Sequence, residues 1–396
     1  MQVSGRRHRY APDVSSRFRP FTALTRPPAP YPILKNMHSG SGKPGELALL
    51  KQIRARAAQR SHGVARGALR LGIGDDCALL RIGAGEELAV TTDLSIDGRH
   101  FRLAWHSPES IGHRTLARGL SDLAAMGARP VAAFLSLGLP KQLVQNQKKW
   151  PGKKPWPAEK TWFDRFLDGF FAVARAHQTP LAGGDLAESP IVVADIVLAG
   201  AVRRGKALLR SGARAGDLLY VTGTLGGSAA GLARLAKLAG NRKARSGPPR
   251  IPARLQSLLA PHLFPQPRIA QGQWLAQRGL ASAAIDLSDG LSTDLAHLCE
   301  ESQVAAEVNA STLPVHPGTT LEQALQGGED YELLFTAPQA ARVPRRIAGV
   351  PVTRIGRILR PRKGRPQVVL VNLQGGAQAR TQDAQLLTPQ GWEHFS

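Results

Sequence analysis

Cysteine is scarce in this sequence, and long apolar runs are absent. The 396-residue chain has two cysteines, Cys77 and Cys299, so it cannot build a disulfide framework, and we expect it in a reducing compartment, the cytoplasm. No apolar run reaches the ~20 residues that a membrane-spanning helix needs. The longest candidate, 191–202, carries Asp195 and is typical of a buried strand. The composition therefore favours neither a secreted disulfide-rich domain nor a membrane protein.

The common phosphate-binding motifs are also missing. Lys43 follows Gly42, but Pro44 stands where a Walker A motif needs Ser or Thr. The protein-kinase motif set is absent as well. A glycine-rich turn, 223–227, precedes an expected helix and could offer backbone N–H groups to an anion. This signal is weak, because glycine-rich turns are common.

Acidic residues are nearly absent from four segments, and these segments explain the net charge of +23. The segment 340–366, for example, has nine basic residues and no acidic one. The other three segments are 1–44, 141–160 and 234–254. Together they carry more than the whole net charge, so the rest of the chain is net acidic. We interpret them as solvated tails, insertions and loops; loose polyanion binding is the alternative, and no specific nucleic-acid partner is expected.

Helical and strand patterns alternate after residue 44 and start again near residue 204, which predicts two α/β domains of similar size. The expected divisions are a disordered basic extension, 1–44, an N-terminal metal- and ATP-binding α/β domain, 45–203, and a C-terminal α/β domain, 204–396. Met37 is a possible alternative start. We expect helices at 46–58, 107–126, 161–177, 266–278 and 291–302, and a further helix that follows the turn 223–228 and runs to about residue 239. We expect strands at 88–92, 131–137, 190–202, 217–222, 282–285 and 331–336, and loops at 141–160 and 240–253.

Aspartates gather in glycine-containing turns at the expected strand ends. The main examples are 72–76, 91–93, 183–185 and 285–290, and Asp122 lies among apolar residues. Converging carboxylates repel one another unless cations lie between them. Magnesium prefers such oxygen ligands and bridges to substrate phosphates, whereas zinc sites are usually built from His and Cys. The pattern therefore predicts a magnesium–phosphate site, although a single Asp-Gly turn is usually only a turn.

A series of motifs runs in order along the chain from about Gly45 to the C-terminus. Two of them are Gly72-Ile73-Gly74-Asp75-Asp76-Cys77-Ala78 and Gly327-Gly328-Glu329-Asp330-Tyr331-Glu332-Leu333. The others are 91–93 followed by His100, 120–128, 183–185, 210–212, 221–224, 228–232, 285–291 and 391–395. In these motifs the sequence closely resembles the thiamine-monophosphate kinases, a family of the aminoimidazole-ribonucleotide-synthetase-like superfamily.

This resemblance implies two packed α/β domains, a homodimer formed through the N-terminal domain, and several Mg²⁺ ions. It implies transfer of the γ-phosphoryl group of ATP to thiamine monophosphate, giving thiamine diphosphate and ADP. By position, the magnesium ligands would be Asp76, Thr91, Thr92, Asp93, Asp122, Asp185, Asp286 and Asp289. The ATP contacts would be Gly184, Asp185, Arg210 and Ser288, and the contacts to the thiamine part His100, Glu329 and Trp392. Asp93, Asp122 and Arg210 would carry the catalysis.

Other members of the superfamily are the nearest alternatives. A selenophosphate synthetase would need a reactive cysteine in a glycine-rich N-terminal loop, and a hydrogenase-maturation protein would need a C-terminal cysteine. Cys77 matches the kinase motif, and the chain ends in Phe395-Ser396. A basic RNA- or membrane-surface-binding protein would explain the charge but not the aspartates.

Overall fold

The computed structural model describes most of the chain beyond the N-terminal extension. The described residues are 46–60, 68–73, 76–144, 160–240, 247–361, 367–372 and 384–391. The expected extension 1–44, most of the insertion 141–160, Asp75 and Trp392 lie outside them. Among the described helices, none is long and apolar enough to cross a membrane.

The N-terminal half is built on a four-stranded sheet in the order β3-β6-β4-β5. Its strands are β3 (Glu86–Ile96), β4 (Arg129–Leu139), β5 (Leu181–Glu188) and β6 (Val193–Arg203). Strand β6 pairs antiparallel with β3 and β4, and β5 pairs parallel with β4. Before the sheet come helix α1 (Glu46–Arg60) and a small hairpin of β1 (Leu69–Leu71) and β2 (Leu79–Leu80). The short helix α3 (Lys141–Val144) follows β4.

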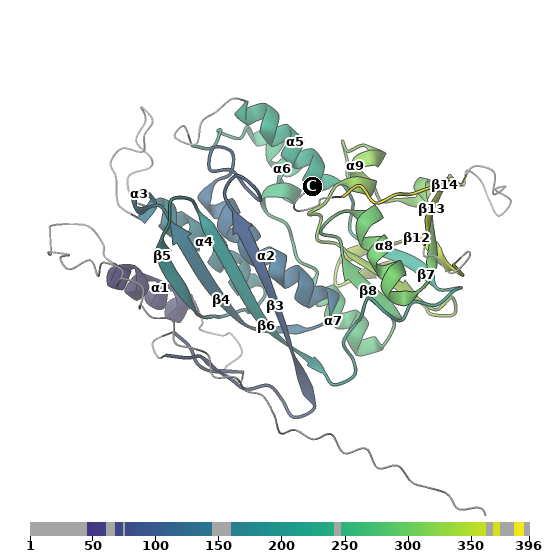
Figure 1. Ribbon diagram of the computed structural model, residues 1–396, viewed down its shortest axis with the longest axis horizontal. Helices are drawn as coiled ribbons and strands as arrows, with labels where there is room; N and C mark the ends of the chain where they lie inside the picture. The colour runs from purple at the N-terminus through teal and green to yellow at the C-terminus, as the bar shows by residue number, and fades with distance from the viewer. Residues whose placement is uncertain are drawn as a thin grey trace, which may run out of the picture. The chain divides into compact units, whose positions relative to one another are not determined.

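Helices α2 (Pro108–Ala125) and α4 (Trp162–Ala176) pack on one face of this sheet (Figure 1). Thr161 and Asp164 form a capping box at the start of α4, which satisfies its first backbone N–H groups. The two helices cross closely, because a Cβ atom at Gly112 would lie 2.0 Å from the carbonyl oxygen of Phe166 and one at Gly169 would lie 1.9 Å from that of Glu109. Only glycine permits this approach at both positions.

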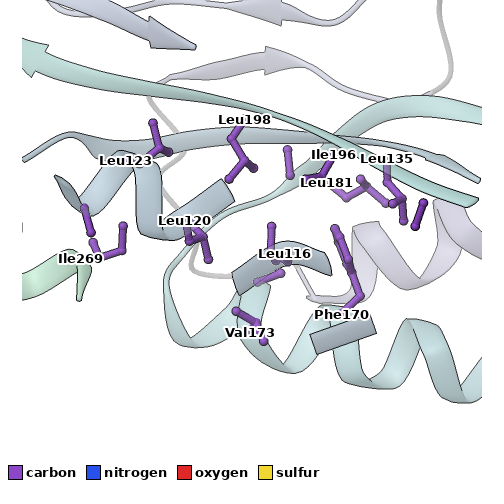
Figure 2. Packing of buried hydrophobic residues seen from close by; sticks show 14 of the residues in the cluster. Leu116, Leu120, Leu123, Leu135, Phe170, Val173, Leu181, Ile196, Leu198 and Ile269 are labelled. Atoms are coloured by element: carbon purple, nitrogen blue, oxygen red, sulfur yellow. The ribbon is translucent and has the colours of Figure 1, made fainter. Parts of the chain in front are cut away.

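Leucines of α2 form the centre of the core between the sheet and α4. Figure 2 shows Leu116 and Leu120 between Leu198 of β6 and Phe170 of α4, all of them fully buried. Ile269 from the C-terminal half belongs to the same cluster. The two halves therefore share one apolar core, which fixes α2 against both.

The C-terminal half contains an eight-stranded, mostly antiparallel sheet in the order β14-β13-β9-β12-β7-β10-β8, with β11 paired to β12. Its strands are β7 (Leu218–Thr222), β8 (Ala283–Asp286), β9 (Ala305–Asn309), β10 (Leu333–Ala337), β11 (Arg346–Ile347), β12 (Val350–Leu359), β13 (Val368–Val371) and β14 (Gln385–Leu386). Its helices are α5 (Gly227–Ala239), α6 (Ala253–Leu263), α7 (Ile269–Arg278), α8 (Leu291–Ser302), α9 (Leu321–Gln326) and the 3₁₀ turn η2 (Ala310–Thr312).

The structure corrects two expectations about the aspartate turns. Asp93 lies inside β3 and Asp185 inside β5, rather than after strand ends. Asp286 does end its strand, as expected. Helix α2 also begins and ends as expected, with Ser107 as its capping residue and Gly127 at a φ of 67° just beyond its end.

Other expectations about local structure were incomplete. Helix α6 was missed, because Pro261 inside it and the basic stretch before it hide its pattern. The insertion 141–160 begins with helix α3 rather than a loop. Strands β9, β12 and β13 and helix α9 were not predicted either.

Candidate functional site

Helix α2 presents a row of charged side chains spaced four residues apart. Arg114, Arg118 and Asp122 lie one above another on one helix face, because residues at i and i+4 are neighbours. Arg114 contacts Glu329 in the loop before β10, whereas the other two contact β3: Arg118 is ion-paired with Asp93, and Asp122 accepts a hydrogen bond from Thr91. The row thus connects α2 to the first sheet and to the loop before β10.

A cavity of about 620 Å³ lies beside this row. Residues from the first half include Asp93, Arg118, Asp122 and most of the segment 98–106. Residues from the second half come from α5, α6, the end of β8 with the turn after it, and the loop before β10. Of the residues predicted from sequence, those that line the cavity are Asp93, His100, Asp122, Asp286, Ser288, Asp289 and Glu329. Seven predicted residues from both halves therefore meet at one place.

Four aspartates, which we call the acidic cluster, form one part of the lining: Asp93, Asp122, Asp286 and Asp289. Burial raises the pKa of Asp93, and the ion pair with Arg118, at 2.8 Å, opposes this rise. Burial and the neighbouring charge of Asp286 raise the pKa of Asp122 well above its ordinary value. Burial also raises the pKa of Asp286, which accepts a hydrogen bond of 2.6 Å from Ser121. Burial is therefore the main cause of all three raised pKa values, and the charges of Arg118 and Arg210 oppose it.

The acidic cluster is not a complete metal cage. Among the described residues, no group of three His, Cys, Asp or Glu side chains is arranged so that it could hold a metal ion. The donors still fit magnesium, which binds through one or two carboxylates and takes its other ligands from water and substrate phosphates. Asp122 and Asp286 both line the cavity, and the charge of Asp286 acts on Asp122, so these two carboxylates are candidates for such a site.

The segment 327–332 holds the two halves of the site together. Glu329 is ion-paired with Arg114 at 2.5 Å. Glu332 is buried and accepts hydrogen bonds of 2.6 Å from Thr222 and from Nε of Arg268. Glu329 and Tyr331 have φ values of 65° and 52°, which non-glycine residues rarely adopt, and such strained backbone gathers at functional sites.

The glycine-rich turn before α5 binds the side chain of Asp330. The backbone N–H groups of Gly226 and Ser228 donate to its carboxylate. An anion does lie at this helix start, but it is the protein's own side chain. The turn therefore positions α5 against the cavity, and these two N–H groups are already satisfied.

The remaining lining is apolar and aromatic. It includes Phe101, Trp105 and the α5 residues Leu232 and Ala236. The guanidinium of Arg102 lies over the Trp105 ring, 4.8 Å from its centroid. His106 and His262, also in the lining, approach each other with a distance of 3.0 Å between their Nε2 atoms. Burial lowers the pKa of both histidines, so both are neutral near pH 7.

Several predicted residues lie outside this cavity lining. Asp76, Gly184 and Asp185 are exposed, and Thr92 points to the opposite face of β3 from Thr91 because successive side chains alternate. Arg210 is exposed, yet its charge lowers the pKa of both Asp122 and Asp286, so it lies within electrostatic reach of the acidic cluster. The roles of these residues stay predictions, as does that of Trp392.

Sequence reasoning missed Arg114, Arg118, Trp105 and the His106–His262 pair. The spacing of Arg114, Arg118 and Asp122 was a signal that could have been found, since it places three charges on one helix face. Asp294 was missed as well. Its buried carboxylate accepts hydrogen bonds of 3.0 Å from the N–H groups of Asp289 and Gly290, which fixes the turn carrying Asp289.

Two family profiles match the chain. The profile described as AIR synthase related protein, N-terminal domain, matches residues 74–202, and its C-terminal counterpart matches residues 214–369. Among curated proteins, the thiamine-monophosphate kinase of Escherichia coli (strain K12) is 38% identical over 340 residues, covering 83% of this chain and 93% of that protein. The thiamine-monophosphate kinase of Salmonella typhimurium is 42% identical over 299 residues, covering 72% of this chain and 83% of that protein.

Solved structures agree with these matches. Thiamine-monophosphate kinase from Stenotrophomonas maltophilia is 38% identical with a TM-score of 0.65, covering 83% of this chain and 97% of that one. AaThiL complexed with AMPPCP and TMP is 28% identical with a TM-score of 0.61, covering 89% and 97%. The hydrogenase maturation protein HypE in complex with ATP is 18% identical with a TM-score of 0.59, covering 90% and 96%, and shares the fold alone.

Proposed function

The chain belongs to the thiamine-monophosphate kinase family, and from this membership we infer that it is an ATP-dependent kinase of thiamine diphosphate synthesis. The reaction moves the γ-phosphoryl group of ATP to thiamine monophosphate and yields thiamine diphosphate and ADP. The single observation that carries this inference is the identity of 38–42% to thiamine-monophosphate kinases over most of the chain. The same relatives favour this reading over selenophosphate synthesis or hydrogenase maturation.

The cavity suits the acceptor. Thiamine monophosphate is a phosphate joined to an aromatic, cationic ring system, and the cavity combines an acidic cluster with aromatic and apolar walls. An aromatic face attracts a cation, an effect worth about 0.5–2 kcal/mol. His100 and Glu329 line the cavity, which supports their proposed contacts to the thiamine part. Trp392 is proposed for the same role from the family resemblance.

The chemistry needs little acid–base help, because the acceptor phosphate is already an anion. Its attack on another phosphate is limited mainly by charge repulsion, so catalysis consists of positioning and charge neutralisation. We assign the holding of Mg²⁺, which neutralises phosphate charge when bound, to Asp93, Asp122, Asp286 and Asp289. Asp76, Thr91, Thr92 and Asp185 are proposed as further ligands on the family pattern. We propose that these residues bind several Mg²⁺ ions.

Nucleotide binding is proposed for four residues of the family pattern, Gly184, Asp185, Arg210 and Ser288. Ser288 lines the cavity beside Asp289, and Arg210 acts electrostatically on Asp122 and Asp286. Gly184 and Asp185 are exposed on β5. The φ of Gly184 is 140°, and a Cβ there would lie 1.9 Å from the carbonyl oxygen of Leu135, so only glycine fits.

We further propose a cytoplasmic homodimer. The β3 face turned away from α2 exposes Leu88, Val90 and Leu94, by 50%, 59% and 45%, and such an apolar patch is typical of an interface. The domain division is proposed as 1–44, 45–203 and 204–396.

One assay tests the proposed function. ADP release is measured with purified protein, ATP and Mg²⁺ in three arms: thiamine monophosphate, thiamine, and no acceptor. The expected result is ADP release only with thiamine monophosphate, with thiamine diphosphate formed in equal amount. Phosphorylation of thiamine, or ADP release that does not depend on the acceptor, contradicts the proposal.

A further inference from the structure

Arg118 is a cation placed among carboxylates. Its side chain is 15% exposed, and Nη2 donates to Oδ1 of Asp93 at 2.8 Å. Nη1 donates to the hydroxyl of Ser95 at a longer 3.3 Å. The residue lies one helical turn before Asp122 and lines the cavity. Its charge is thus held at the acidic cluster by two residues of β3.

The other arginines of the lining are placed differently. Arg99 and Arg102 come from the segment after β3, and Arg102 lies over Trp105. Among the described residues that line the cavity, Arg118 is the one arginine ion-paired to a member of the acidic cluster. Arg114, on the same helix row, is engaged by Glu329 and by the carbonyl of His262. A phosphate that enters the cavity beside Asp93 therefore meets the guanidinium of Arg118.

The contacts of Arg118 leave it capacity for a ligand. A guanidinium has five N–H donors in a planar fork that suits phosphate oxygens, and the described residues accept from two of its nitrogens. Asp93 uses Oδ1 for this contact, so its Oδ2 remains for a magnesium ion. One carboxylate can therefore serve the metal and the arginine together.

We propose that Arg118 binds the phosphate of the acceptor and makes the enzyme select thiamine monophosphate over thiamine. This rests on the proposed function and adds a residue to it. The acidic cluster repels a phosphate, and a charge-assisted hydrogen bond from Arg118 offsets that repulsion at the position where the phosphate must lie. Thiamine has no phosphate and gains nothing from this contact.

The test is calorimetric binding of thiamine monophosphate and of thiamine, with saturating Mg²⁺ and no nucleotide. The variants are Arg118→Met, Arg118→Lys and, as a matched control, Arg56→Met, which removes an ion pair between α1 and α4 outside the cavity lining. In Arg118→Met the Kd for thiamine monophosphate should rise about 10- to 100-fold, the effect of a hydrogen bond to a charged group. The Kd for thiamine should stay within about twofold. Arg118→Lys keeps the positive charge but not the planar guanidinium, so its Kd for thiamine monophosphate should rise less than that of Arg118→Met.

The outcomes separate the possible roles of Arg118. An equal rise in the Kd for both ligands would show that Arg118 only orients Asp93 and would overturn the inference. An unchanged Kd for thiamine monophosphate would also overturn it. If Arg118→Met does not fold, Arg118→Lys decides: a higher Kd for thiamine monophosphate with an unchanged Kd for thiamine supports the inference, and any other result overturns it. Failure of the proposed function is a different result, because then the wild-type protein forms no thiamine diphosphate.

Discussion

Ser121 donates a hydrogen bond of 2.6 Å to Asp286, and this contact joins helix α2 of the first half to the end of strand β8 in the second. Both residues are buried. A buried carboxylate that loses a donor carries a desolvation cost of about 1–3 kcal/mol. The bond therefore couples the packing of the two halves to the orientation of a proposed magnesium ligand.

Ser121→Ala should lower both stability and activity. Loss of the hydroxyl should reduce the free energy of unfolding by about 1–3 kcal/mol and raise the Mg²⁺ concentration needed for half-maximal rate, because Asp286 loses its fixed orientation. Denaturant unfolding and a Mg²⁺ titration measure the two effects. The control is Ser110→Ala on the same helix, where a buried hydroxyl donates to the Ser107 carbonyl. A shifted Mg²⁺ dependence in the control would contradict the interpretation.

Asp93→Asn and Asp122→Asn should reduce kcat by about 100- to 1000-fold at saturating substrates. Each change removes a charge that acts on the reacting phosphates, and one lost electrostatic contact of this kind costs about 3–4 kcal/mol. Steady-state kinetics measures the effect. Asp168→Asn is the matched control, since Asp168 is paired with Lys160 and Arg56 away from the cavity. A change confined to the affinity for thiamine monophosphate would disprove the assignment of these aspartates to phosphoryl transfer.

The contrast between Asp286 and Asp93 shows what sequence could and could not predict. The apolar run that ends in Asp286-Leu287-Ser288-Asp289-Gly290 predicts a turn after a strand, and Asp286 is the last residue of strand β8. Asp93 was placed after its strand because the expected apolar run stopped at Thr92, but β3 continues to Ile96 by pairing with β6. Long-range pairing of this kind is invisible in a local pattern.

Arg118 shows the same limit for a side chain. On a helix of mixed polarity, an arginine is by default a solvated residue. Whether it meets Asp93 depends on how α2 packs against β3, which tertiary contacts decide. The aspartates of the acidic cluster could be predicted from the family motifs. The ion pair between Arg118 and Asp93 could be found only in the structure.

Trp105→Ala should raise the KM for thiamine monophosphate several-fold and leave the KM for ATP unchanged. Its ring lies in the cavity lining, and contacts to the unreacting part of a substrate act on KM more than on kcat. His100→Ala should act in the same direction. Trp274→Ala is the control, because Trp274 also lies beneath an arginine, Arg278, but outside the cavity lining. An increased KM for ATP alone would place the thiamine part elsewhere.

Asp330→Asn should change how stability depends on pH. Burial raises the pKa of Asp330 from 3.8 to about 7, and the hydrogen bonds from Gly226 and Ser228 oppose this only in part. Between these values the folded state binds more protons at Asp330 than the unfolded state, so its contribution to stability falls as pH rises through the window. The variant should lose this contribution, so its stability should decline less steeply than that of the wild type between pH 4 and 7. Thermal unfolding across pH, with the exposed Glu300→Gln as control, measures the slopes; equal slopes in all three proteins would refute the assignment.

Val90→Asp should convert the proposed homodimer to a monomer. Val90 is 59% exposed on the β3 face turned away from α2, beside Leu88 and Leu94. Among the described residues, the β1–β2 hairpin covers another part of this sheet face, where Leu69 and Leu80 pack near Ala199, and Leu88, Val90 and Leu94 are left exposed. A carboxylate buried at the centre of an apolar interface without a partner costs far more than a surface substitution.

The matched control for Val90→Asp is Leu386→Asp, which changes a residue that is 58% exposed on β14 of the other sheet. Light scattering during gel filtration should give a dimer for the wild type and the control, and a monomer for Val90→Asp. The melting temperature measured at low concentration should barely change, because Val90 is exposed in the single chain. A Val90→Asp protein that remains dimeric would move the interface away from β3, and a monomeric wild type would remove the proposed homodimer.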